Sequence, residues 1–170
     1  MAMAHIRRSV EGSIEYLTAH PEEVRYTDSP AIAVIDGLRS TVQGTNGESL
    51  LTDMPRSVGG ADSAPSPGWL LRAAIASCEA TLIAMRAAQE GIELSALEVT
   101  VDSESDDRGI LRMDASVPAG PLSVRIHVKA AARGVSAEKL GEIVEWADHH
   151  CPVSDAVRRA VPTTVDVELP

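Results

Sequence analysis

SPGWLLRAAIASCEATLIAMRAAQEG, residues 66–91, is the stretch that decides the fold of this chain. Ser66 suits the N-cap position of a helix and Pro67 its first turn, while Gly91 is a typical terminator. Between them apolar side chains recur at steps of three and four residues: Leu71, Ile75, Cys78, Leu82 and Met85. This spacing predicts one long helix with a continuous buried stripe that includes Cys78.

Strand-like alternation dominates the segments on both sides of this helix. From Ala31 onward, two apolar runs are separated by turn signals at Asp36-Gly37 and Asn46-Gly47, which predicts an antiparallel meander of two or three strands. After Gly91, apolar and polar residues alternate through 97–101, 111–117 and 122–128, and again near the C-terminal end, 165–169. That period of two predicts four further strands.

Shorter helices complete the predicted elements. Ser136 opens a helix that ends before Pro152, because the residue preceding a proline disfavours helical geometry. Ser154 is expected to cap a short helix over DAVRRAV. Residues 1–30 are interpreted as a short helix with an extended link, since Pro21 interrupts anything longer. The strands come in antiparallel runs, so the predicted fold class is α+β rather than doubly wound α/β.

The composition narrows the functional classes. A net charge of −10 repels phosphate backbones, and only two Trp and two Tyr are available to stack on bases, so nucleic-acid binding is not expected. No apolar run reaches the length of about 18 residues that a membrane span needs. The N-terminus lacks the apolar segment of a secretory signal, which predicts a cytoplasmic protein without a permanent structural disulfide.

The two cysteines, Cys78 and Cys151, are the candidate reactive groups. Cys78 suits a core position as well as a reactive thiol, since free cysteine behaves as a small hydrophobe. Cys151 lies in HHCPVSD, just before a helix whose unpaired N–H groups favour a thiolate. A spacer role at this turn is equally compatible with the sequence.

Other chemistries find less support. His149, His150 and the two cysteines offer four metal ligands in principle, but neither C-x-x-C nor H-x-x-x-H spacing occurs. A Ser/His/Asp hydrolase lacks its G-x-S-x-G turn, and Gly59-Gly60 stands outside any phosphate-binding motif. We therefore expect neither a metal nor a bound cofactor.

Three segments together resemble the OsmC/Ohr family of osmotically inducible and organic-hydroperoxide-resistance proteins. SPGWLLRAAIASC is similar to the family's entry into its central helix, which runs from a proline through apolar residues to a cysteine, and CPVSDAVR to its C-P-x-S-x-A-x-R motif. DGLRSTVQG and PRSVGGADSAPSP look like its hairpin and Gly-rich loop. The resemblance covers about Ala31 to Leu169. Residues 1–30 lie outside it and are interpreted as an N-terminal helical extension. The resemblance implies one OsmC-like domain over 31–170 and an intertwined homodimer with antiparallel sheets around a central helix.

The resemblance also implies an activity. In peroxidase members the helix cysteine attacks the O–O bond of a hydroperoxide, and the second cysteine condenses with the resulting sulfenic acid to a disulfide that an external dithiol or lipoyl-type reductant opens. Cys78 matches the first cysteine and Cys151 the second, in a site formed across the subunit interface that takes small apolar hydroperoxides. Arg39 matches the arginine that stabilises the thiolate, and Arg56 is the second choice for that cation.

One position departs from the family pattern. Family peroxidases carry a glutamate just after the proline that opens the helix, where it holds the arginine, and here that position is Gly68. Glu79 follows Cys78, but one step along a helix turns about 100°, so it is expected to point elsewhere. The departure leaves a second hypothesis: an OsmC-fold protein that binds a small molecule or senses redox state without efficient peroxidase turnover.

Overall fold

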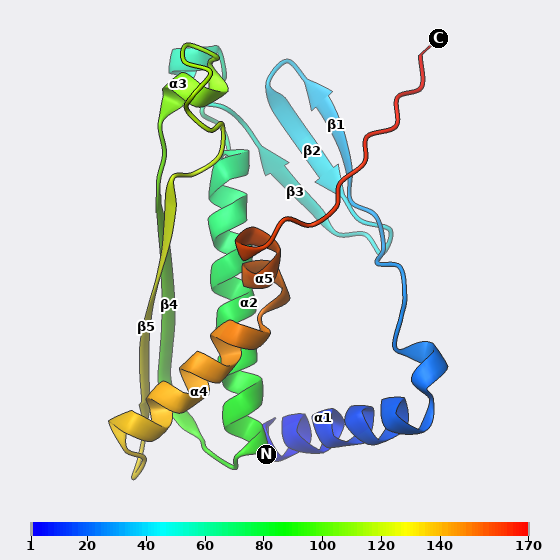
Figure 1. Ribbon diagram of the computed structural model, residues 1–170, viewed down its shortest axis with the longest axis vertical. Coiled ribbons are helices and arrows are strands. Elements are labelled where there is room, and N and C mark those ends of the chain that lie inside the picture. Colours follow the sequence, from blue (N-terminus) through cyan, green and yellow to red (C-terminus); the bar gives the residue numbers. More distant parts are fainter. Residues whose placement is uncertain (1, 170) are drawn as a thin grey trace. The chain divides into compact units, whose positions relative to one another are not determined.

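The computed structural model describes residues 2–169 of the chain and has an α+β architecture (Figure 1). Its helices and strands follow in the order α1 (Ala2–Ala19), η1 (Pro21–Glu23), β1 (Ile32–Asp36), β2 (Arg39–Gln43), β3 (Ser49–Thr52), η2 (Arg56–Val58), α2 (Pro67–Gln89), β4 (Leu94–Glu104), α3 (Asp107–Ile110), β5 (Ser123–Ala132), α4 (Ala137–His150) and α5 (Pro152–Arg158), where η marks a 3₁₀ turn. The predicted fold class, with its antiparallel sheets and long central helix, is confirmed.

The chain divides into two compact units, each described here by itself. The thiol unit comprises residues 2–7, 75–100 and 126–169, and it contains both cysteines. The meander unit comprises residues 8–74 and 101–125, including β1 to β3. The boundary expected at residue 30 remains a prediction.

Local signals set the ends of α2 as predicted. The Ser66 hydroxyl accepts a hydrogen bond from the Trp69 N–H at 3.2 Å, which caps the first turn. At the other end Gly91 has a φ of +72°, and the Ile92 N–H donates a hydrogen bond to the Ala87 carbonyl oxygen at 2.8 Å. By length and apolar composition α2 also meets the criterion for a membrane span, which core helices of globular proteins meet as well. Five of its residues are buried in the single chain: Ile75, Glu79, Ile83, Ala87 and Ala88.

The buried stripe of α2 differs from the predicted one. The fully buried positions follow steps of four residues, from Ile75 through Glu79 and Ile83 to Ala87, whereas Cys78 is only half-buried. The predicted stripe, which included Cys78, is therefore off by one residue at this point: Glu79 is fully buried and Cys78 is not. The side chain that occupies the buried position beside Cys78 is a carboxylate.

The core of the thiol unit lies between α2 and α4. Ile83 and Ala87 of α2 pack with Ile143 and Ala147 of α4, and all four are at most 1% exposed. Leu97 and Val99 of β4 and Val128 of β5 pack against this cluster. The α4 helix begins as predicted, since the Ser136 hydroxyl accepts from the Lys139 N–H at 3.1 Å.

The predicted meander is confirmed as three antiparallel strands in the order β1-β2-β3, drawn in blue to cyan in Figure 1. Asp36 pairs with Arg39 across the first turn, and Thr41 pairs with Leu51 between the second and third strands. Gly37 makes the first turn possible because its φ is +63°, a conformation that side chains disfavour. Most apolar side chains of β1 are exposed in the single chain.

A buried carboxylate orders the loop that leads from β3 toward α2. Asp53, 2% exposed, accepts hydrogen bonds from the backbone N–H groups of Met54, Ala61 and Ser63 and from the Ser63 hydroxyl at 2.7 Å. The bonds from Ser63 lead those that lower the pKa of Asp53 from 3.8 to about 2. The loop is also close-packed, because a Cβ at Gly60 would lie 1.8 Å from the Met54 carbonyl oxygen.

Three predicted segments are corrected by the structure. The N-terminal helix is longer than expected, because Pro21 lies beyond its last residue, Ala19. The strand expected over 111–117 is wrong. Asp106 caps the short helix α3 by accepting from the Arg108 N–H, and the chain then turns through Arg112, whose φ is +56°.

The last predicted strand, 165–169, is also not formed. No regular secondary structure follows α5 up to residue 169, and Val165, Val167 and Leu169 are 83%, 69% and 82% exposed. An alternating sequence forms a strand only when another strand supplies hydrogen bonds, and the described chain supplies none here.

Candidate active site

The structure brings the two cysteines together within the thiol unit. Cys78 lies in the middle of α2 and is half-buried, whereas Cys151 lies between α4 and α5 and is 0% exposed. Both are free thiols, and Cys151 is close enough to Cys78 to be one of the groups that raise its pKa. Residues 73 positions apart in sequence are thus paired by the packing of α4 and α5 beside α2.

The surroundings of Cys78 act on its pKa in opposite directions. Burial is the largest effect and raises the pKa above its ordinary value, and the contact with Cys151 and the charge of Glu79 raise it further. A hydrogen bond from the Val153 N–H lowers it. The net shift is upward, so the thiol unit alone favours the protonated form of Cys78.

Cys151 is itself the N-cap of α5. Its backbone is extended, with φ of −74° and ψ of 112°, and its sulfur accepts from the Ser154 N–H at 3.5 Å. The predicted cap at Ser154 was therefore wrong, and the helix begins earlier, at Pro152. Proline suits the first helical position because its φ is fixed and its missing N–H needs no partner there.

Glu79 is the site residue that sequence reasoning missed. It is 1% exposed, and its Oε1 accepts a hydrogen bond from the Ser154 hydroxyl. The step of about 100° from Cys78 was correct, but that direction faces α5 rather than solvent. A carboxylate among the apolar residues of a helix, next to a cysteine, was the available signal.

Arg158 is a cation of the same unit. It lies one turn after Ser154 on α5, and its Nη1 donates to the Asp148 carbonyl oxygen at 2.9 Å. The guanidinium also pairs with the Asp148 carboxylate. Arg158 interacts electrostatically with both Glu79 and Cys151, so these two acidic groups face a positive charge.

Comparison with known proteins shows to which family the chain belongs. The sequence profile described as OsmC-like protein matches residues 60–166, which is more than half of the chain. The chain belongs to the OsmC-like family. A search of the curated protein sequences finds no match.

Solved structures agree with the OsmC-like fold. The organic hydroperoxide resistance protein OsmC of Legionella pneumophila superposes with a TM-score of 0.59 at 24% identity, covering 79% of this chain and 91% of that one. An OsmC-like protein of Mycoplasma pneumoniae gives 0.66 at 15% identity over 79% and 89% of the two chains. OhrB, the organic hydroperoxide resistance protein of Bacillus subtilis, gives 0.52 at 20% over 78% and 91%. At these identities the likeness shows the fold.

The arginine and glycine positions of the OsmC-like pattern lie in the meander unit. Arg39 begins β2 opposite Asp36, with an exposed side chain, and its role beside Cys78 remains a prediction. Arg56 lies in η2, where its Nε donates to the Ala61 carbonyl oxygen at 3.5 Å. Gly68 has open space around it, since an added Cβ would meet only the Ser66 Oγ at 3.9 Å.

The two histidines that precede Cys151 lie at the surface. The His150 ring stacks on Trp146 with centroids 4.1 Å apart, its Nδ1 lies 2.6 Å from the Trp146 carbonyl oxygen, and both His149 and His150 are exposed. Over residues 2–169 the structure shows no group of three or more His, Cys, Asp or Glu side chains arranged around a possible metal position.

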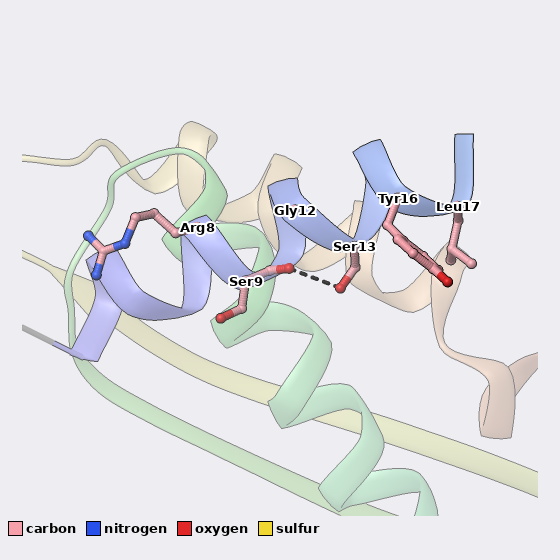
Figure 2. Close-up of a pocket in the computed structure, with 6 residues that line it drawn as sticks. All are labelled: Arg8, Ser9, Gly12, Ser13, Tyr16 and Leu17. Atoms are coloured by element: carbon pink, nitrogen blue, oxygen red, sulfur yellow. Dashed lines mark hydrogen bonds between the residues drawn. The ribbon is translucent and has the colours of Figure 1, made fainter. Parts of the chain in front are cut away.

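A hollow on α1 is a second surface feature of this OsmC-like protein. Figure 2 shows the six residues that line it, all from one helix: Arg8, Ser9, Gly12, Ser13, Tyr16 and Leu17. The dashed bond, from the Ser13 hydroxyl to the Ser9 carbonyl at 2.9 Å, is internal to the helix. The hollow contains neither cysteine, so we place the candidate active site at the thiol pair.

Proposed function

We propose that this OsmC-like protein is a thiol-dependent peroxidase that reduces organic hydroperoxides through Cys78 and Cys151. The observation that supports it is the contact of two free thiols, one buried and one half-buried, in the fold of organic hydroperoxide resistance proteins. The burial of Cys151 keeps bulk water from its sulfur, while the partial exposure of Cys78 suits the approach of a small apolar hydroperoxide.

The proposed cycle has one oxidation, one condensation and one reduction. The Cys78 thiolate attacks the O–O bond of ROOH, takes one oxygen as a sulfenic acid, and the alkoxide leaves as ROH after taking a proton. The Cys151 thiol then attacks the Cys78 sulfenic acid, which forms the disulfide and releases water. A dithiol or lipoyl-type reductant, itself oxidised to a disulfide, restores both thiols.

The first step needs a cation beside Cys78. Because burial raises the pKa of this thiol, a nearby positive charge is required to produce the thiolate at neutral pH. Arg39 is the proposed source, by its match to the family arginine. Gly68 supplies no carboxylate to orient it, so Arg39 is held here without the bidentate partner of the family peroxidases.

The proposal includes a homodimer with the site at the subunit interface, in the cytoplasm. Family members interlock their N-terminal sheets, and the exposed apolar residues of β1 fit such an arrangement. The partners of the protein are then a second copy of this chain, the hydroperoxide and the reductant, with no nucleic acid and no membrane.

The direct test is hydroperoxide consumption. Purified protein with dithiothreitol is expected to consume tert-butyl or cumene hydroperoxide, and Cys78→Ser to reduce consumption to the background rate. Cys151→Ser is the matched control, which without dithiothreitol should consume one equivalent of hydroperoxide and then stop at the Cys78 sulfenic acid. Equal consumption by Cys78→Ser, or none by the unaltered protein, would remove the proposal.

One observation favours a second candidate function. The raised pKa of Cys78, together with Gly68, suits a slow redox sensor or a small-molecule binding protein that uses the same fold. The alkylation rate of Cys78 as a function of pH discriminates the two. A midpoint well below the ordinary thiol value supports the peroxidase, and a midpoint at or above it supports the sensor or binding protein.

A further inference from the structure

Glu79 is a buried ionisable group that the proposed cycle does not use. Its side chain is 1% exposed, and its neighbour in sequence is the peroxidatic cysteine of the proposed mechanism. Taking a carboxylate out of water is unfavourable unless hydrogen bonds or opposite charge compensate. The structure supplies both, a hydroxyl donor from Ser154 and the positive charge of Arg158, and both come from α5.

Ser154 connects this carboxylate to the second thiol. Its hydroxyl donates to Glu79 Oε1, while its backbone N–H donates to the Cys151 sulfur at 3.5 Å. Ser154 is 2% exposed and Cys151 is 0% exposed, so water does not compete for these bonds. Hydrogen bonds thus connect Glu79 of α2 through Ser154 to Cys151, and Cys78 lies near Cys151.

The Glu79–Ser154 contact is a side-chain bond between α2 and the first turn of α5. Cys151 caps that turn, and the Val153 N–H donates to the Cys78 sulfur from the same turn. Loss of the bond from Ser154 would free the turn to move relative to α2 and separate the two sulfurs. Two thiols form a disulfide only when their sulfurs reach about 2.05 Å in a defined geometry, so small displacements slow closure.

We propose that Glu79 is a positioning residue for the resolving step: through the Ser154 hydroxyl it holds Cys151 against Cys78 while the disulfide closes. This inference rests on the proposed thiol cycle. The step concerned is the attack of Cys151–SH on Cys78–SOH, in which the S–S bond forms, the S–O bond breaks, and the thiol proton leaves with the hydroxide as water. Glu79 touches no reacting atom in this step.

The test separates oxidation of Cys78 from closure of the disulfide. Full-length protein is mixed with one equivalent of tert-butyl hydroperoxide and quenched over time with dimedone, which traps sulfenic acid, and with iodoacetamide. Mass spectrometry then counts dimedone adduct and disulfide in each variant. Ser154→Ala removes only the hydroxyl donor, and Glu79→Gln retains an oxygen that can accept the same hydrogen bond.

We expect the unaltered protein to show mainly disulfide and Cys151→Ser to show only the dimedone adduct. In Ser154→Ala, closure should slow about tenfold, the equivalent of one lost hydrogen bond of about 1.4 kcal/mol. The rate of Cys78 oxidation should stay within about twofold of normal in the same variant, because the lost hydrogen bond does not act on this step. Glu79→Gln should close at the normal rate.

Two controls distinguish a specific effect on disulfide closure from a general loss of stability. Ser136→Ala removes the N-cap of α4, far from the thiols in sequence, and should weaken the fold without accumulating the adduct. Diamide, which takes up the two thiol hydrogens itself, measures closure in the same variants without any hydroperoxide.

Normal closure in Ser154→Ala with either oxidant would overturn the inference and leave the proposed function intact. Slow closure in Glu79→Gln would also overturn it, because the carboxylate charge and not the hydrogen bond would then be responsible. If hydroperoxide fails to oxidise Cys78 while diamide still closes the disulfide more slowly in Ser154→Ala, the peroxidase function fails and the positioning role of Glu79 stands.

Discussion

The thiol unit and the meander unit differ in how well they bury their apolar side chains. In the thiol unit Ile83 and Ile143 are at most 1% exposed, and the polar group beside the thiols, Glu79, has a hydrogen-bond donor. In the meander unit Val34 and Ile35 of β1 are 64% and 67% exposed. The core between α2 and α4 is therefore packed within one chain, although the C-terminal residues Val165, Val167 and Leu169 of the same unit stay exposed. The meander strands still have apolar surface to cover, which supports the proposed dimer.

Two isoleucine substitutions test this difference with the same chemical change. Ile143→Ala should lower the free energy of unfolding by about 2–5 kcal/mol, because it leaves a cavity in the core. Ile35→Ala should cost less than about 0.5 kcal/mol in the dissociated chain, as exposed substitutions do. Urea unfolding at low protein concentration measures both.

The Ile35→Ala variant also tests the proposed dimer. At high protein concentration the unaltered protein should sediment as a dimer in analytical ultracentrifugation, and Ile35→Ala should weaken this self-association. Equal unfolding costs for the two substitutions, or a monomer at all concentrations, would contradict the comparison.

A second test asks whether the meander unit supplies the cation for Cys78. Arg39→Ala should slow hydroperoxide turnover by about tenfold or more, a loss of about 1.4 kcal/mol in the barrier, and shift the alkylation midpoint of Cys78 to higher pH. Arg56→Ala is the matched control and should change turnover less than about twofold. A larger effect from Arg56 than from Arg39 would reassign the cation.

A third substitution restores the family carboxylate. Gly68→Glu should raise turnover by up to about tenfold, since a charge-assisted hydrogen bond would orient Arg39. An added Cβ at Gly68 would meet only the Ser66 Oγ, at 3.9 Å, so Gly68→Ala, which adds only this atom, is the control. No gain from Gly68→Glu over Gly68→Ala would show that the missing carboxylate does not limit the reaction.

The smallest effect concerns the loop ordered by Asp53. Hydrogen bonds lower the pKa of Asp53 from 3.8 to about 2, so the stability it contributes is present above about pH 4 and is lost as the pH falls toward 2. The difference in melting temperature between the unaltered protein and Asp53→Asn should therefore shrink between pH 5 and pH 2. A difference independent of pH would contradict this role of the carboxylate.

The elements with local signals were predictable from the sequence. The ends of α2 follow from the Ser66 cap and Gly91, and the first hairpin turn follows from Gly37, because each acts within a few residues. The pairing of Cys78 with Cys151 was expected only through the family resemblance, since their distance in space depends on how α4 and α5 pack.

Two of the failures had non-local causes, and one had a local cause. The alternation over 165–169 predicts a strand, but the described chain offers it no partner. The alternation over 111–117 also predicts a strand, but the chain forms turns there instead, at Arg112 and around Asp114. The Asp114 carboxylate accepts a hydrogen bond from the Ser116 N–H at 2.9 Å. Glu79 was missed because a helical period gives the direction of a side chain and not the identity of the element it faces.

The central claim, that Cys78 and Cys151 form one redox pair, is tested most directly by mapping the oxidised protein. After treatment with one equivalent of tert-butyl hydroperoxide, the intact mass should fall by two hydrogens. Proteolysis without reduction should then yield a crosslinked peptide that contains Cys78 and Cys151. An unchanged mass, or an oxygen adduct on Cys78 with Cys151 still free to alkylate, would contradict the account.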